Sequence, residues 1–178
     1  PLIMGYIWYF LIQPERGFYN LLLQRLNSNL HMPDWYSQSS ISLLVLIIIN
    51  VWQYAGMTMV IFLAGLQAIP QEVYEAAHVD GANRRATFWY ITLPLLKPSM
   101  KINVITNIIG SLAVFDIIMA LTEGGPGYAT ESLSIYIMRM CYGNSTGYST
   151  AVAIMLFIIT LIPVITYLRL SKRQGFEL

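Results

Sequence analysis

Long stretches of apolar residues dominate the chain, and charged residues occur only between them. No Asp, Glu, Lys or Arg is present at positions 35–71, 102–115 or 140–168. A helix needs about 20 mainly apolar residues to cross the hydrocarbon layer of a membrane. Inside a bilayer the backbone must satisfy its own hydrogen bonds, and these runs lack the two-residue alternation of a barrel strand. We therefore predict membrane-spanning helices.

Four membrane segments follow from these runs. We place the complete spans at about Ser42–Leu66, Ile102–Leu121 and Thr146–Leu168. The remaining run, Leu2–Ile12, is too short to cross a membrane by itself. It follows Pro1 directly, with no initiator Met and no signal peptide pattern. We therefore expect it to be the outer end of a helix that begins in missing N-terminal sequence.

The distribution of basic residues predicts the orientation of these spans, because Lys and Arg favour the cytoplasmic side. Residues 67–101 and the C-terminal tail lie on the same face, since two spans separate them. We expect both to be cytoplasmic, with residues 13–40 and 122–145 outside. The two predicted cytoplasmic regions hold seven of the ten basic residues, namely Arg84, Arg85, Lys97, Lys101, Arg169, Lys172 and Arg173.

Composition agrees with a membrane protein and excludes several other classes. Hydrophobic residues make up 56% of the chain and charged residues 11%, against about 25% charged in soluble domains. The net charge of +1 gives no reason to expect nucleic-acid binding. A single cysteine excludes an internal disulfide, and His31 and His78 lack the spacing of metal ligands, so we expect no metal site. The sequence motifs of intramembrane or α/β-hydrolase enzymes are also absent.

Aromatic residues gather near the predicted outer boundary of the spans. Amphipathic rings often lie at the level of the lipid headgroups. Packing of aromatic side chains within the loops is an equally good interpretation. The residues concerned are Trp35, Tyr36, Tyr128, Tyr136 and Tyr142.

The loop between the second and third spans has the pattern of a compact helical unit. Pro70 suits the first turn of a helix, and Gly81 suits a left-handed C-terminal position. Asn83 can cap a second short helix, which Pro94 would close. Such a unit could dock on another protein or lie on the headgroups as an interfacial helix, and its chemistry favours neither. The second helix would carry Arg84, Arg85, Phe88 and Trp89.

The same loop carries a family motif. It reads Glu75-Ala76-Ala77, then three residues to Gly81, then nine residues to Ile91-Thr92-Leu93-Pro94. This resembles the EAA loop of the permease subunits of binding-protein-dependent ABC importers. The flanking residues 64–70 and 93–98 resemble the carbohydrate branch, and residues 115–126 resemble the maltose-permease type. The resemblance extends over nearly the whole chain.

The resemblance implies an all-α polytopic transmembrane helical bundle of the ABC importer type I permease fold. Residues 1–178 would form a single, partial transmembrane domain, with the EAA coupling loop at residues 67–98. In that family the loop forms a coupling helix that docks on the ATP-binding subunit. The coupling residues would be Glu75, Ala76, Ala77 and Gly81, flanked by Arg84 and Arg85.

The chain has no GxxxxGK[ST] phosphate loop, so ATP must be hydrolysed elsewhere. We expect a transport subunit that is not an enzyme and holds no cofactor, with ATP and Mg used by a partner. The resemblance implies a second, homologous permease in a heterodimer, two ATP-binding subunits and an extracytoplasmic solute-binding protein. It also implies a location in the bacterial cytoplasmic membrane.

The expected solute is a sugar or oligosaccharide. The complete spans contain no basic residue, which argues for a neutral solute over the alternative of a glycerol-phosphate-type or other polar solute. A less favoured alternative is an ATP-independent secondary transporter. That class typically has paired intramembrane charges or broken helices at the midplane.

Polar residues spaced three or four apart follow one face of the second and third spans. Such a stripe usually faces a cavity or a neighbouring helix rather than lipid. Amide and hydroxyl groups suit sugar hydroxyls, but they also join helices to one another. The candidate solute-pathway residues are Asn50, Tyr54, Met57, Asn103, Asn107 and Ser111.

Asp116 is the one carboxylate inside a predicted span. It lies five residues before Leu121, close to the expected outer boundary. We favour a structural hydrogen bond to the Gly124-Gly125 turn over a role in proton coupling, because an ATP-driven transporter does not need a proton.

Overall fold

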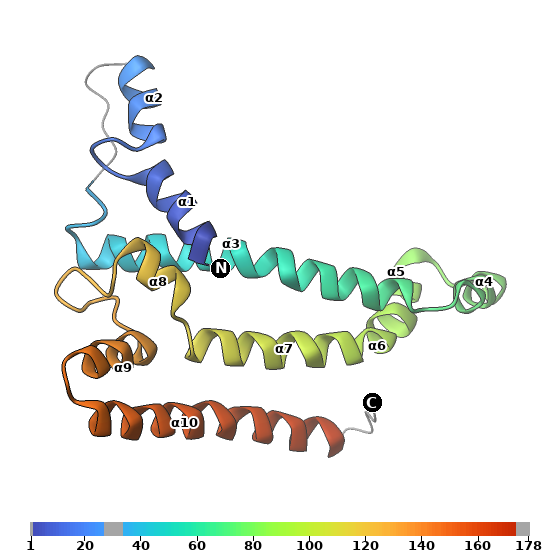
Figure 1. Ribbon diagram of the computed structural model, residues 1–178. Helices are drawn as coiled ribbons and strands as arrows, with labels where there is room; N and C mark the ends of the chain where they lie inside the picture. The colour runs from blue at the N-terminus through green and yellow to red at the C-terminus, as the bar shows by residue number, and fades with distance from the viewer. Residues whose placement is uncertain (1, 27–33, 174–178) are drawn as a thin grey trace. The chain divides into compact units, whose positions relative to one another are not determined.

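The computed structural model describes residues 2–26 and 34–173, and within these two ranges the protein is all-α, with no strand (Figure 1). Two helices are long and apolar enough to cross a membrane, at Ser39–Gln67 and Thr146–Ser171. They correspond to the predicted second and fourth spans. His31 and the end of the tail lie outside the described residues.

The chain forms two compact units, each made of two separate stretches. The first comprises Pro1–Trp52 and Ser111–Thr160, and the second comprises Gln53–Gly110 and Leu161–Leu178. The long helices α3 (Ser39–Gln67) and α10 (Thr146–Arg173) contribute to both. The expectation of one transmembrane domain over residues 1–178 stays a prediction.

The first unit is built around the packing of α1 (Leu2–Ile12) on α8 (Asp116–Leu121). A Cβ atom added at Gly5 would overlap the Cβ of Ala120, so the two helices meet at this glycine. The unit also contains α2 (Phe18–Leu26) and α9 (Leu133–Tyr142). Its core is mainly aliphatic and also contains Trp35; the other core residues include Ile12, Leu46, Ile49, Ile117, Leu121 and Ile135.

Trp35 is a core residue of this unit. Its side chain is only 2% exposed, and the indole N–H donates a hydrogen bond to the carbonyl of Ile12 at 2.6 Å. This burial agrees with the other interpretation, packing of aromatic side chains within the loops. Tyr36, Tyr128 and Tyr142 are exposed, as either interpretation allows.

The predicted third span is interrupted. Helix α7 (Lys97–Leu112) ends, and α8 begins at Asp116, so the prediction of one continuous span over Ile102–Leu121 was wrong. Two interactions stabilise the break. A carboxylate is favourable in the first turn of a helix, and the hydroxyl of Ser132 donates to the carbonyl of Val114 at 2.7 Å. That carbonyl has left the helical ladder and would otherwise need another partner.

In the second unit, α3 and α7 approach each other at two glycines. A Cβ atom at Gly65 would lie 2.9 Å from the Cβ of Ser99. A Cβ atom at Gly110 would lie 2.8 Å from two ring carbons of Tyr54. Figure 1 shows the second half of α3 running beside α7 with the loop helices at their shared end. The glycines therefore fix the closest approach of the two helices.

Candidate functional site

The EAA motif begins on a short exposed helix, α4 (Gln71–Val79). Pro70 is the residue immediately before this helix, with φ −59° and ψ 140°, and not part of its first turn as predicted. Glu75 accepts a hydrogen bond from the side-chain amide of Gln71 at 2.9 Å, one turn earlier. Ala77 is buried, whereas Glu75 and Ala76 are exposed. The helix therefore packs inward through Ala77 and presents Glu75 outward.

A tight turn ends α4 in the way the sequence predicts. Gly81 has φ +76°, the left-handed conformation that glycine adopts without a steric penalty. The amide of Ala82 donates to the carbonyl of Ala77 at 2.9 Å, and that of Gly81 to His78 at 3.0 Å. Nothing lies within 4 Å of a Cβ atom added at Gly81. The backbone conformation thus favours glycine at position 81, and the space around the turn leaves room for a partner protein.

The second helix of the loop starts at the predicted cap. The side-chain oxygen of Asn83 accepts a hydrogen bond from the amide of Ala86 at 2.9 Å, at the start of α5 (Arg84–Thr87). Arg84 and Arg85 are both exposed in this single turn. The cap therefore fixes the point at which these two basic side chains leave the backbone.

Pro94 does not close the unit as expected. Helix α5 continues into a π-helical turn, η1 (Phe88–Thr92), and then into α6 (Leu93–Leu95), where Pro94 lies. Hydrogen bonds from Leu96 to Thr92 and from Met100 to Leu96 carry the helical path into α7. Proline is tolerated near a helix start, and a π turn changes the hydrogen-bond register, so the missing N–H does not end the helix. The loop is therefore joined to α7 by nearly continuous helix.

One side-chain contact links the two arms of the loop. The hydroxyl of Thr92 donates to the phenolic oxygen of Tyr74 at 3.4 Å, which joins η1 to α4. Thr92 is buried, at 8% exposure. Sequence reasoning missed both residues, although Thr92 lies inside the motif segment 91–94. Only the folding of the loop brings these residues together.

The six candidate solute-pathway residues do not form one described site. Asn50 and Ser111 belong to the first unit, and the other four belong to the second. Tyr54 is half-buried against Gly110, whereas Met57 is 59% exposed. Their role in solute passage stays a prediction.

Asn103 differs from the other polar residues of α7. Its side chain is 5% exposed, yet neither its amide nitrogen nor its oxygen has a hydrogen-bond partner among the described residues. The side-chain amide of Asn107 instead donates to the backbone carbonyl of Asn103 at 2.8 Å. A buried amide without a partner carries a desolvation cost of about 1–3 kcal/mol. Asn103 is therefore the polar residue of this helix that most needs an additional partner.

The segment after α8 is held by hydroxyl groups. The hydroxyls of Thr122 and Thr130 lie 2.8 Å apart, and Thr130 donates to the carbonyl of Gly125 at 2.6 Å. Within the described ranges no hydrogen bond joins this turn to Asp116. The expected bond between Asp116 and the Gly124-Gly125 turn was therefore wrong, because the two threonines supply the contacts.

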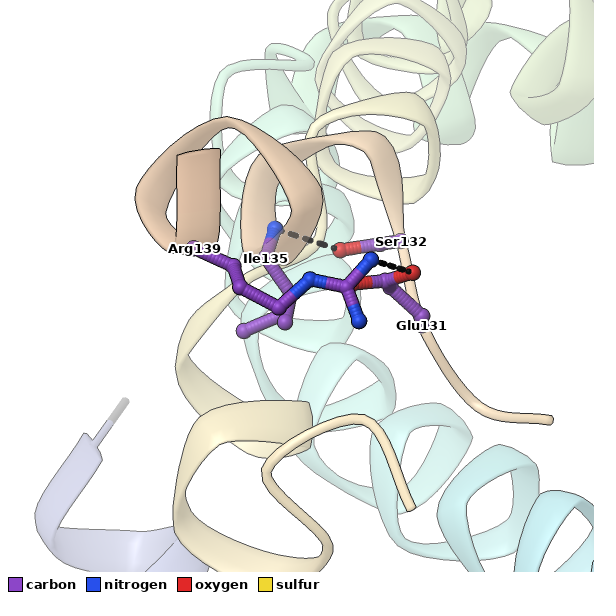
Figure 2. A network of polar contacts seen from close by, with 4 residues as sticks. All are labelled: Glu131, Ser132, Ile135 and Arg139. Carbon is purple, nitrogen blue, oxygen red and sulfur yellow. Dashed lines mark hydrogen bonds and ion pairs between the residues drawn. The ribbon is translucent and has the colours of Figure 1, made fainter. Parts of the chain in front are cut away.

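Helix α9 begins with a small polar network (Figure 2). Ser132 caps the helix by accepting from the amide of Ile135 at 3.3 Å, and Glu131 pairs with Arg139 at 3.0 Å. The guanidinium of Arg139 also lies 4.0 Å from the ring centre of Tyr128. Tyr136 is also on α9, and a hydrogen bond with Tyr148 of α10 raises the pKa of Tyr136. These contacts order the segment that is predicted to be outside.

Comparison with known proteins identifies the family. The family model described as "binding-protein-dependent transport system inner membrane component" matches residues 1–175. The chain belongs to this permease family. Membership agrees with the all-α membrane fold and with the resemblance found in residues 75–94. It also accounts for the absence of enzyme motifs, because the relatives are transport permeases.

Two curated permeases are similar to most of this chain. The trehalose/maltose transport system permease protein MalF of Thermococcus litoralis is 36% identical over 171 residues, covering 96% of this chain and 57% of that protein. The xylose/arabinose import permease protein XacH of Haloferax volcanii is 33% identical over 175 residues, covering 97% of this chain and 55% of that protein. The chain thus spans little more than half the length of these two permeases.

A solved structure has a similar fold. It is a bacterial alginate ABC transporter in complex with a periplasmic protein that carries an alginate pentasaccharide. One chain of that transporter matches with a TM-score of 0.79 and 27% identity, covering 96% of this permease and 59% of that chain. The helical arrangement is therefore that of an ABC importer permease.

Proposed function

We propose that this permease forms the membrane pathway of an ATP-driven ABC importer for a sugar or oligosaccharide. The observation that carries the proposal is the EAA unit, an exposed helix α4 with an open Gly81 turn, joined by nearly continuous helix to α7. Family membership supports the same conclusion. An exposed helix joined in this way to a pathway helix suits the transfer of motion from an ATPase.

The coupling residues would act through shape and charge. Glu75 and Ala76 face outward from α4, and Gly81 leaves an open turn beside them, so a partner can approach the backbone closely. Arg84 and Arg85 would flank this surface. When the ATP-binding subunits close, α4 would move as a rigid body and displace α7.

The partners follow from the same proposal. ATP and Mg would be used by two ATP-binding subunits. These subunits would lie on the cytoplasmic side of the membrane, as would the EAA loop and the C-terminus. A homologous permease would complete the pathway as a heterodimer, and an extracytoplasmic binding protein would deliver the solute. The complexed periplasmic protein of the alginate importer supports this last partner.

The solute class rests on two observations. The relatives' names mention trehalose, maltose, xylose and arabinose, and the apolar runs at residues 35–71, 102–115 and 140–168 contain no basic residue. A neutral sugar therefore fits better than a glycerol-phosphate-type solute. Asn103 and Asn107 are the amides best suited to meet sugar hydroxyls, with Asn50, Tyr54, Met57 and Ser111 as further candidates.

The test is solute-stimulated ATP hydrolysis by the full complex in liposomes that contain the binding protein. We expect a neutral oligosaccharide to stimulate wild type, and Gly81→Asp or Glu75→Lys to assemble but lose the stimulation. Gly127→Asp and Glu72→Lys are matched controls, since Gly127 is also open at φ +56° and Glu72 lies on the same helix. Fully coupled loop variants would identify the loop as an interfacial helix instead. Transport without an ATPase subunit would establish a secondary transporter.

A further inference from the structure

The EAA loop contains a hollow between its two helical arms. The hollow has a volume of about 240 Å³ and is lined by residues of α4, α5 and η1. It belongs entirely to the second unit. The residues that matter here are Tyr74, His78, Arg84, Thr87, Phe88 and Thr92.

The polar groups around this hollow are suited to an anion. Arg84 contributes a permanent positive charge and His78 a ring N–H, whereas the hydroxyl of Thr87 already donates to the carbonyl of Asn83 at 3.1 Å. Its lining contains no carboxylate, and in the described part of the chain Arg84 forms no ion pair. The planar guanidinium binds a carboxylate through two parallel hydrogen bonds. The hollow is therefore basic and open, on a surface where Glu75 also faces outward.

The arms of the hollow are fixed before any ligand arrives. Asn83 caps α5 and so sets the position from which Arg84 extends. The bond between Thr92 and Tyr74 holds η1 against α4 at the base. A site organised in this way loses less conformational entropy on binding.

The size and location favour a protein side chain as occupant. Pockets for small-molecule ligands occupy about 300–1,000 Å³, more than this hollow offers. Ile102, where the apolar part of α7 begins, lies ten positions after Thr92, and ten steps of helix span about 15 Å. The headgroup layer on one side of a membrane is about 5–8 Å thick. Both comparisons favour a protein side chain over a small molecule or a lipid phosphate.

We infer that this hollow receives an acidic side chain of the ATP-binding subunit, with Arg84 as its main partner and His78 as a further donor. The inference rests on the proposed coupling function and adds to it which of the two proteins carries each charge. The permease contributes the cation and the ATPase contributes the carboxylate. This contact would be separate from the one made by Glu75 on α4.

The experiment measures the affinity of the purified ATP-binding subunit for the full-length permease pair in nanodiscs. We expect Arg84→Gln to weaken binding at least about tenfold, as truncation of one member of a hydrogen-bonded charge pair does. His78→Leu should weaken it about threefold, the effect of one lost hydrogen bond. Thr87→Val removes a hydroxyl that donates to the carbonyl of Asn83 in its own helical turn, and it should bind like wild type. Arg85→Gln removes the same charge from the next position, which does not line the hollow, and should cost clearly less.

Charge exchange identifies the occupant. In an Arg84→Glu permease, replacing acidic residues of the ATP-binding subunit one at a time by lysine should restore binding at one position. Equal losses in Arg84→Gln and Arg85→Gln, or no restoring position, would overturn the inference. An effect of Arg84→Gln that appears only in nanodiscs with anionic lipid would assign the hollow to a headgroup and overturn it too.

Failure of this inference is distinguishable from failure of the coupling proposal. If Gly81→Asp abolishes solute-stimulated ATP hydrolysis while Arg84→Gln binds normally, only the hollow has been misassigned. If Gly81→Asp remains fully coupled, the proposed function of the loop fails as well.

Discussion

The ring of Tyr54 on α3 lies directly against the backbone of Gly110 on α7. A Cβ atom at position 110 would come within 2.8 Å of two ring carbons, closer than non-bonded carbons approach. Glycine therefore makes room here for the neighbouring ring, and no positive φ angle calls for it. The contact holds together two helices that we propose line the solute pathway.

Gly110→Ala should destabilise the complex, because the added methyl forces Tyr54 to move. Overpacking of this kind costs about 1–3 kcal/mol. Thermal unfolding of the purified complex should show a lower midpoint than wild type. Gly56→Ala on α3 is the control, since nothing lies within 4 Å of its added methyl and alanine favours the helix. Equal midpoints for the two variants would contradict the contact.

Asn83→Ala should loosen the start of α5 and reduce coupling. The variant loses the side-chain acceptor for the amide of Ala86, and the loss of an N-cap costs about 1 kcal/mol. Faster hydrogen exchange over residues 84–92 and weaker solute-stimulated ATP hydrolysis are expected together. Asn83→Asp keeps the acceptor and should behave like wild type. If the aspartate variant exchanges as fast as the alanine variant, the cap is not the cause.

Ser132→Ala should destabilise the folded conformation of the segment between α7 and α8. One hydroxyl donates to the carbonyl of Val114 and accepts from the amide of Ile135, so its removal leaves both groups unpaired. The expected cost is about 1–3 kcal/mol, measured as a lower unfolding midpoint of the complex. Ser132→Thr retains the hydroxyl and should restore the midpoint. Ser134→Ala, two residues further along, should have a clearly smaller effect.

Asn103→Leu should separate stability from transport. Leucine has a similar size and removes a buried amide that has no partner in the described chain, so the complex should be as stable as wild type or more stable. If Asn103 contacts the solute, uptake into liposomes should fall about tenfold, the value of one lost hydrogen-bonding group in a buried site. Thr106→Val removes a hydroxyl that bonds only its own helix and is the control. Normal uptake by the leucine variant would exclude Asn103 from the pathway.

Local sequence signals determined much of the loop and of the long helices. The start of α10 at Thr146, the cap at Asn83 and the left-handed Gly81 were all predictable. Each depends on residues within one or two helical turns, where hydropathy, side-chain capping and backbone freedom act directly. The family motif at residues 75–94 belongs to the same class of local signal.

The tertiary structure decided the features that depend on residues far apart in sequence. The break before Asp116 needs Ser132, and the burial of Trp35 needs the carbonyl of Ile12, 23 residues earlier. Likewise, the basic hollow is lined by residues of α4, α5 and η1, which lie together only in the folded loop. A hydropathy pattern cannot reveal such pairs, because the free energy that stabilises them comes from contacts formed only when the chain has folded.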